Sequence, residues 1–312
     1  MALTLTQAEL YTTNSVYAGV IDEFYRASPI FPRMPFDDVV GNAHQYLRES
    51  TRGNAPFRSP TEVWTESTPT QTQVTVALKI LGDDADIDNF LKKTRSNHTD
   101  IEGEIIAGKA RDLKFAFLDA FYYGDDAVNS KEFDGLHLLI PSGNRIAQGS
   151  GSTAAALQVS NIDAVIDEIE GYVPDILVFP KVVRRRLNAY MRLNGGTYQE
   201  TRDEWGNMVS EYNGVPLYVD DSLVTTETIA SGTYSAKTGG TNTGSIFAIR
   251  FDPKAVFGIQ NGGVETYKVS DNLETKDGSR WRIKWYVSMG LGSTVSGAAV
   301  VDGIATNLAV TA

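Results

Sequence analysis

One stretch of the chain, from Leu47 to Ile80, limits the possible folds more than any other, because it is long, polar and rich in turn-forming residues. It holds three prolines and a single tryptophan, Trp64, and it has no lysine before Lys79. A structureless loop of more than about 15 residues is rare inside a compact domain, so this stretch is either disordered or functional. Apolar residues alternate with others near its end, at Val74, Val76, Leu78 and Ile80. This period of two indicates a half-buried strand, and we therefore expect a projecting hairpin.

The length of this arm indicates what it is for. Folded back on itself, it would reach on the order of 50 Å at about 3.3 Å per residue. A compact chain of 312 residues has a radius of gyration of only about 20 Å, so the arm would extend across neighbouring molecules. Phe57 and Trp64 would then be exposed far from their own core, and burial against other copies would give them a use. The alternative is a disordered surface loop.

Composition is that of an ordinary globular protein, with 42% hydrophobic and 21% charged residues. No apolar run approaches the ~20 residues that cross a bilayer, and residues 1–10 do not resemble a signal peptide, so we expect a soluble protein made in the cytosol. The absence of cysteine excludes disulfides and thiolate sites. The net charge of -11 argues against a general nucleic-acid binder. It is compatible both with an acidic container for DNA and with an acidic enzyme.

The first half of the chain predicts helices and an extended strap. A short helix is expected at about Thr13–Tyr25, and three prolines within Ser28–Pro35 then favour an extended conformation. Asp83–Asp88 precede another short helix, whose N-terminus acidic residues would stabilise. The longest helix pattern runs from about Asp100 to Tyr122, with an apolar stripe along about 33 Å. After it, Phe133–Ile140 predicts a short strand and a turn.

A second domain is expected after the small-residue hinge Gly149–Thr153. Its first elements are a helix, a buried strand and a helix, at Ile162–Ile169, Asp175–Phe179 and Val183–Tyr190. This order is typical of a layered α/β domain. The polar stretch Tyr198–Tyr212 is expected to form a long loop. Near the C-terminus, Arg280–Val287 alternates with two tryptophans on one face, and we expect this strand to pack on the long helix.

The residues predict no catalytic, cofactor or metal site. The three histidines, at positions 44, 98 and 137, have no ligand spacing and are expected at the surface or partly buried with partners. The residues from Asp84 onward do not match a calcium-binding loop. Asn89 occupies the position that requires glycine, and Arg95 occupies the position of the bidentate glutamate. Gly290–Gly297 has the wrong spacing for a phosphate loop. A structural or binding protein is therefore favoured over an enzyme.

Taken in order, these motifs resemble the major capsid protein of tailed bacteriophages, which has the Hong Kong 97 fold. The strap is similar to the N-arm of that family, the Leu47–Ile80 hairpin to its E-loop, and the long helix to its spine helix. Phe133–Leu136 looks like the strand after the spine, and Arg280–Val287 like the return to the peripheral domain. The blocks that resemble the axial domain are Ile162–Ile169, Asp175–Pro180, Asn213–Asp220 and Ser245–Pro253.

The resemblance implies an α+β Hong Kong 97-like capsid fold with four parts. These are an N-terminal arm at 1–40, an extended loop at 41–81, a peripheral domain at 82–148 and 264–312 with a spine helix at 100–122, and an axial α/β domain at 149–263. It further implies contacts between subunits, by packing and charge, through Arg48, Arg52, Phe57, Arg58, Trp64, Arg184, Arg185 and Trp205.

By the same resemblance, the chain is a homo-oligomer of hexamers and pentamers in an icosahedral shell around phage double-stranded DNA. Implied partners are a portal and a separate scaffolding protein. Because arm-like sequence starts almost at Met1, the scaffold is expected to be a separate protein or to be absent. The implied location is the virion capsid, assembled in the host cytoplasm without a membrane and without a cofactor. Because the arm lacks lysine before Lys79, we expect no covalent crosslink between subunits. An encapsulin-like compartment for protein cargo and a soluble α/β enzyme are the alternatives.

Overall fold

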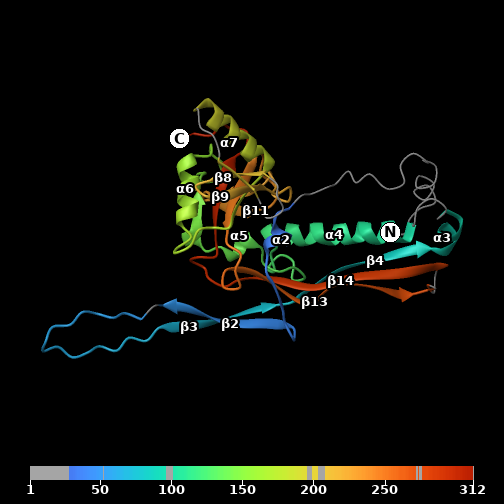
Figure 1. The fold of residues 1–312 in the computed structure, drawn as a ribbon, viewed down its shortest axis with the longest axis horizontal. Coiled ribbons are helices and arrows are strands. Elements are labelled where there is room, and N and C mark those ends of the chain that lie inside the picture. Colours follow the sequence, from blue (N-terminus) through green and yellow to red (C-terminus); the bar gives the residue numbers. More distant parts are fainter. Residues whose placement is uncertain are drawn as a thin grey trace.

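A computed structural model describes residues 28–51, 53–95, 101–194, 199–202, 208–271, 273 and 276–311. The molecule has three visible parts (Figure 1): a long narrow sheet with a helix along it, an α/β lobe at one end of that helix, and a hairpin that projects the opposite way. The helix expected at Thr13–Tyr25 lies outside the described residues.

Four strands form the long sheet, in the order β1-β13-β14-β4. Its three long strands are antiparallel neighbours, and β1 joins β13 in parallel. The strand predicted at Arg280–Val287 is confirmed as part of β14, with Ile283, Trp285 and Val287 buried. The bounds are β1 Phe36–Asp38, β4 Lys79–Asp88, β13 Val256–Ser270 and β14 Gly278–Leu291.

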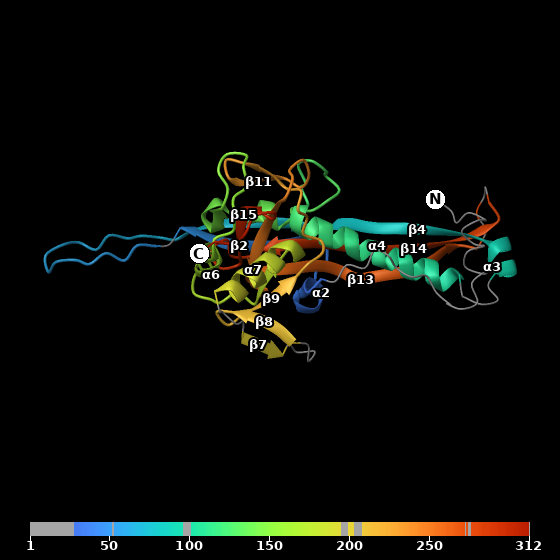
Figure 2. The same ribbon diagram turned by 90° about the horizontal axis from the view of Figure 1, so that it is seen from above.

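The predicted spine helix is confirmed as α4, Ile101–Tyr123, which lies along one face of the long sheet (Figure 2). The fully buried Phe117 joins the two layers, since its ring centroid lies 5.0 Å from that of Trp285 on β14. The helix ends at Gly124, where a side chain would overlap the carbonyl oxygen of Phe133. At the other end of the sheet lies the short helix α3, Asn89–Arg95.

The segment after the spine helix differs from the prediction. Instead of a short strand and turn, Leu136–Leu139 form a single helical turn, α5. The Gly135 amide donates to the Gly124 carbonyl at 2.9 Å, so the chain doubles back tightly and starts the turn against the end of α4. A 3-10 turn, η1 Ser142–Asn144, follows.

A seven-stranded mixed sheet forms the α/β lobe, in the order β5-β15-β12-β6-β9-β8-β7. Helices α6 (Val159–Asp167) and α7 (Lys181–Leu193) confirm the two predicted helices, and β6 is buried throughout as predicted. The bounds are β5 Arg145–Ala147, β6 Ile176–Phe179, β7 Gln199–Arg202, β8 Met208–Tyr212, β9 Val215–Val219, β12 Thr243–Ile249 and β15 Ala298–Ala305. A small separate sheet pairs β10 (Thr228–Ala230) with β11 (Thr233–Ala236).

Alternate residues of β6 face two cores. Leu177 and Phe179 pack in the cluster under α6 and α7, whereas Ile176 and Val178 pack in the cluster that contains the end of α4. A strand that packs against a hydrophobic core on both of its faces has a continuous run of apolar residues. For this reason the sequence of β6 predicted a fully buried strand.

Two expectations about this lobe need correction. The stretch 198–212, expected as a loop, holds the antiparallel pair β7 and β8 in its described residues. The segment 264–312 was assigned to the peripheral domain, yet β15 within it pairs with β12 in the seven-stranded sheet. The chain therefore returns to the lobe after β14, because the apolar Ala298–Ala305 is buried at every position there.

The N-terminal strap is not fully extended. Ile30–Arg33 form a helical turn, α2, closed by the Met34 amide, which donates to the Ile30 carbonyl at 2.9 Å. Proline is tolerated in the first turn of a helix, where amides have no partner within the helix, and Pro35 then forces Met34 into an extended conformation. The strap packs against its own chain, with the Phe31 ring centroid 5.1 Å from that of Phe117.

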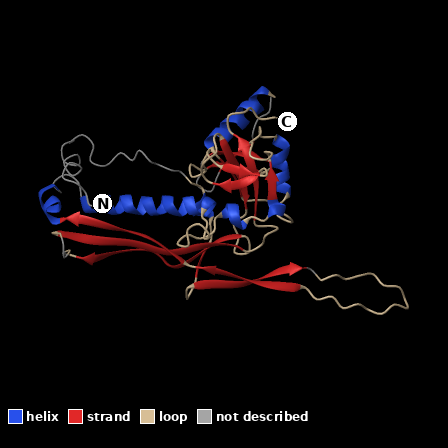
Figure 3. Ribbon diagram, turned by 180° about the vertical axis from the view of Figure 1, so that it is seen from behind, coloured by secondary structure: helices blue, strands red, loops and turns tan. Residues whose placement is uncertain are grey.

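The predicted hairpin is present. Strands β2 (Ala43–Thr51) and β3 (Thr70–Ala77) pair antiparallel and project well beyond both sheets (Figure 3). The period of two predicted for the second strand holds to Leu78, just after β3 ends. The chain then enters β4 at Lys79, and Ile80 is exposed rather than half-buried.

Candidate assembly surfaces

The base of the hairpin is fixed to the long sheet of its own chain. The Tyr46 hydroxyl donates to the Leu291 carbonyl at 2.7 Å, and Arg48 Nε donates to the Gly292 carbonyl at 2.9 Å. On the partner strand, Val74 lies opposite Tyr46 and Val76 lies opposite His44, and both valines are half-buried. Arg48, expected at a contact between subunits, is thus placed in a contact within its own chain.

The tip of the hairpin, residues 53–69, extends into solvent. Phe57 is 106% exposed and Trp64 is 72% exposed. The Arg58 guanidinium lies over the Trp64 ring at 4.6 Å and donates to the Glu62 carbonyl at 2.5 Å. The Ser59 amide donates to the Glu62 carboxylate at 2.8 Å. The structure therefore brings three predicted contact residues together at one exposed tip. Arg52, also predicted as a contact, lies outside the described residues.

The outer face of the long sheet carries a ladder of ion pairs. Arg282 binds Asp84 through two hydrogen bonds of 2.7 and 2.8 Å, and Arg280 binds Asp86 through bonds of 2.5 and 2.7 Å. These bonds lower the pKa of both carboxyl groups. The acidic cluster was expected to stabilise a helix N-terminus, but only Asp88 does so, by accepting from the Phe90 amide at 2.8 Å.

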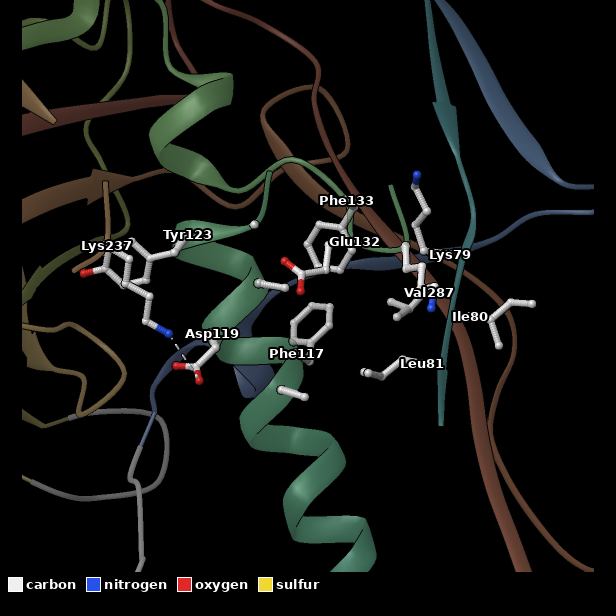
Figure 4. Close-up of a pocket in the computed structure, with 14 residues that line it drawn as sticks. Lys79, Ile80, Leu81, Phe117, Asp119, Tyr123, Glu132, Phe133, Lys237 and Val287 are labelled. Carbon is white, nitrogen blue, oxygen red and sulfur yellow. Dashed lines mark ion pairs between the residues drawn. The ribbon is translucent and has the colours of Figure 1, made fainter. Parts of the chain in front are cut away.

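An open cavity of about 430 Å³ lies between the start of β4, the spine helix, residues 131–133 and β14 (Figure 4). Leu81, Phe117 and Val287 supply apolar walls. At the rim, Lys237 pairs with Asp119 at 3.5 Å, and a dashed line marks this pair in Figure 4. The cavity thus combines apolar walls with a charged rim.

A buried polar cluster joins the end of the spine helix to the α/β lobe. His137, on α5, is 2% exposed and stacks on the Tyr234 ring at 3.8 Å. Its ring nitrogens each lie 3.6 Å from a fully buried carboxylate, Nε2 from Glu227 and Nδ1 from Asp302. Arg145 Nη1 donates to Asp302 at 2.5 Å. The expectation of a surface or partly buried histidine is therefore wrong for His137.

Tyrosine hydroxyls tie the spine helix into the same region. The Tyr123 hydroxyl donates to Glu227 at 2.6 Å, and burial, with the nearby carboxylate, raises the pKa of Tyr123 well above its usual value. One residue earlier, the Tyr122 hydroxyl donates to Asp220 at 3.0 Å. Asp220 also accepts from the Ser28 hydroxyl of the strap at 2.5 Å, and burial raises its pKa. Strap, spine helix and lobe are thus held in one fixed arrangement.

The basic helix α7 lies at the outside of the lobe (Figure 1). Arg184 and Arg185 are both exposed, while Arg186 is half-buried and donates to the Asn307 carbonyl at 3.1 Å. Trp205, predicted as a further contact in this lobe, lies outside the described residues.

The described residues contain no group of three or more His, Asp or Glu side chains placed to hold a metal ion. Within the same residues, no helix is long and apolar enough to span a membrane.

Solved structures of other proteins match this chain over nearly its full length. An encapsulin complex, holo-SrpI of Synechococcus elongatus PCC 7942, matches with a TM-score of 0.71 at 12% identity, over 99% of this chain and 98% of that one. The capsid of cyanophage A-1(L) matches with a TM-score of 0.68 at 11% identity, over 95% and 99%. The capsid of an empty GTA particle matches with a TM-score of 0.66 at 12% identity, over 98% and 99%.

The chain has the Hong Kong 97-like capsid fold. The resemblance drawn from the order of the motifs is therefore confirmed at the level of the fold, including the spine helix and the extended hairpin. No protein-family model and no curated protein matches the sequence. Most of the similar structures are phage or phage-like capsids, and the chain covers nearly their full length.

Sequence reasoning missed two features of this capsid fold. The first is the ladder on the long sheet, although Asp84, Asp86 and Asp88 alternate with Ala85 and Ile87, and this period of two indicates a strand. The second is the exposed acidic end of α6, which includes Asp167 and Glu170.

Proposed function

We propose that the chain is a major capsid protein that assembles, as hexamers and pentamers, into an icosahedral shell around phage double-stranded DNA. The projecting hairpin carries this proposal. Its tip exposes Phe57 and Trp64 far from any core of its own chain. Exposed aromatic residues at a locally ordered tip are typical of a surface that is buried on assembly.

The similar structures support a shell in particular. Several are phage capsids, and two were obtained from GTA capsids with C5 symmetry, so the fold is used in closed assemblies. A portal and a separate scaffolding protein are proposed as partners, and the proposed location is the virion. Within this proposal the protein has a structural rather than a catalytic role.

Expression followed by negative-stain microscopy and light scattering tests the proposal. We expect closed shells or capsomer rings, formed by the chain alone or with its scaffolding protein. A well-folded monomer or dimer that never assembles under either condition would refute it. A matched variant, in which a two-residue turn replaces residues 53–68, should fold but fail to form shells, because the described contacts of the tip are local.

An encapsulin-like compartment is a second candidate, favoured by the match to the encapsulin complex at a TM-score of 0.71. The contents of particles purified from the native host separate the two functions. Nuclease-protected double-stranded DNA of genome length supports the capsid, whereas a single enriched cargo protein without DNA supports the compartment. The same particles address covalent crosslinking, since denatured shells should yield only the 34.0 kDa subunit by mass.

A further inference from the structure

Charges are strongly segregated on the two helices of the α/β lobe. Between Arg145 and Lys181 the sequence has no basic residue other than these two ends, and α6 with its following loop carries five carboxylates. Helix α7 then carries Lys181 and four arginines with no acidic residue. For a chain with a net charge of -11, this helix is a conspicuous basic surface.

The acidic surface at the end of α6 consists of Asp167, Glu168 and Glu170. Asp167 and Glu170 are exposed and Glu168 is half-buried. Asp163, one turn earlier, is already used within the chain, since it accepts from the Tyr212 hydroxyl and from the Asn213 amide group, both at 2.8 Å. In the described part of the chain, the three later carboxylates form no ion pair, so this surface is uncompensated there.

The basic surface of α7 consists of Arg184 and Arg185. Both are exposed, and within the described residues neither forms an ion pair. Their neighbours are engaged, since Lys181 pairs with Asp221 at 2.7 Å and Arg192 Nε donates to the Asn188 carbonyl at 3.2 Å. The two arginines are therefore the charges of α7 that are available to a partner.

The two helices pack on the same face of the seven-stranded sheet but lie apart from each other on the lobe. In Figures 1 and 2, α6 lies on the side toward which the hairpin projects, and α7 lies nearer the side of the spine helix. A ring of identical subunits joins two different surfaces of the chain at each contact. Suppose that the hairpin side of one copy faces the spine-helix side of the next copy in the ring. The α6 helix of the first copy then lies toward the α7 helix of the second.

We infer that the acidic surface at the end of α6 binds the basic surface of α7 of a second copy in the capsomer ring. The inference rests on the proposed function and names a contact within it. Apolar residues lie beside both surfaces and add contact area, since Tyr172 and Val173 follow α6 with 57% and 63% exposure, and Leu193 ends α7 with 86% exposure. Opposite charges orient the contact, and like charges disfavour the reversed one.

Charge reversal with a swap tests the inference. The variant R184E/R185E places acid against acid, and D167K/E170K places base against base, so each should lower the yield of rings or shells at least tenfold. The fourfold variant restores opposite charges across the contact, and its yield should return to within about twofold of wild type. Circular dichroism and urea unfolding of unassembled subunits check that each variant folds.

A control changes the net charge equally elsewhere. Lys93 and Lys254 are exposed on α3 and after β12, so K93E/K254E should assemble like wild type. If R184E/R185E assembles normally, or if the fourfold variant fails while each reversed pair folds, the inference is wrong and the proposed shell function stands. Normal empty shells from R184E/R185E with reduced DNA content would also overturn it, because the arginines would then face DNA. Failure of wild type itself to assemble would instead refute the proposed function.

Discussion

Replacement of Phe117 by alanine should cost the subunit about 5 kcal/mol of unfolding free energy. The side chain is fully buried, and its ring centroid lies within 6.3 Å of five other aromatic rings. Those rings are Phe31, Phe36, Phe121, Phe133 and Trp285. A buried Phe→Ala change costs about 3–5 kcal/mol, and each lost aromatic pair adds about 0.5–1.5 kcal/mol beyond area. The loss should therefore lie at the upper end of the usual range.

The expected shift in melting temperature follows from chain length. At about 2.1 cal/mol/K per residue, a chain of 312 residues unfolds with an entropy of roughly 0.65 kcal/mol/K. A loss of about 5 kcal/mol then lowers the midpoint by roughly 8 °C. Because Phe31 lies in the strap and Phe36 in β1, amides of residues 28–38 should also exchange hydrogen faster in the variant than those of the lobe.

Urea unfolding of unassembled subunits, followed by tryptophan fluorescence, measures this loss. Phe90 on α3 is the matched control, because it is 62% exposed and its truncation should change stability by less than about 0.5 kcal/mol. F117L keeps more of the apolar volume, so it should lose roughly half as much unfolding free energy. It replaces F117A in this test if F117A does not fold. If F117A loses less than about 1.5 kcal/mol, Phe117 does not join the spine helix, the strap and the long sheet as described.

Three further outcomes are expected. The double variant F57A/W64A should form far fewer shells yet unfold at the same urea midpoint as wild type; a lower midpoint would contradict the placement of the tip in solvent. The hydrogen bond from Arg282 lowers the pKa of Asp84, so this pair stabilises the fold above the unfolded pKa near 3.9 and is lost as pH falls through the lower folded value. The stability of R282Q should thus differ from wild type by a constant amount above about pH 5 and converge on it as pH falls from 5 toward 2, and a difference that stays constant down to pH 2 would refute the pairing. Burial raises the pKa of Asp220, so its contribution is full below the unfolded pKa and is lost as pH rises through the folded value. Relative to D220N, wild type should therefore become less stable from pH 4 to pH 7, and the opposite trend would refute this account.

Local periodicity made much of the fold predictable. The apolar stripe of residues 100–122 fixed the spine helix to within one residue at each end. The alternation of Trp281, Ile283, Trp285 and Val287 defined a strand whose buried face meets that helix. Both signals arise because one face of each element is apolar, and a single sequence carries that information whatever the partner is.

The exposed tip was predictable for a different reason. Its prolines and polar residues exclude it from a core, and this exclusion needs no knowledge of contacts. Phe57, Arg58 and Trp64 accordingly lie at an exposed tip, as the sequence indicates.

Only the tertiary structure decided which segments pair across long distances in the sequence. Asp84 lies about two hundred residues from Arg282, and β15 joins β12 rather than the long sheet. Arg48 binds the carbonyl of Gly292, 244 residues away in its own chain. A charged residue or an alternating segment indicates that an ion-pair partner or a neighbouring strand is needed. Which residue or strand that is depends on how the strands are ordered in the sheets. For that reason the elements were fixed by local pattern, whereas the ion pairs, the strap and the surfaces left for a second copy were fixed by packing.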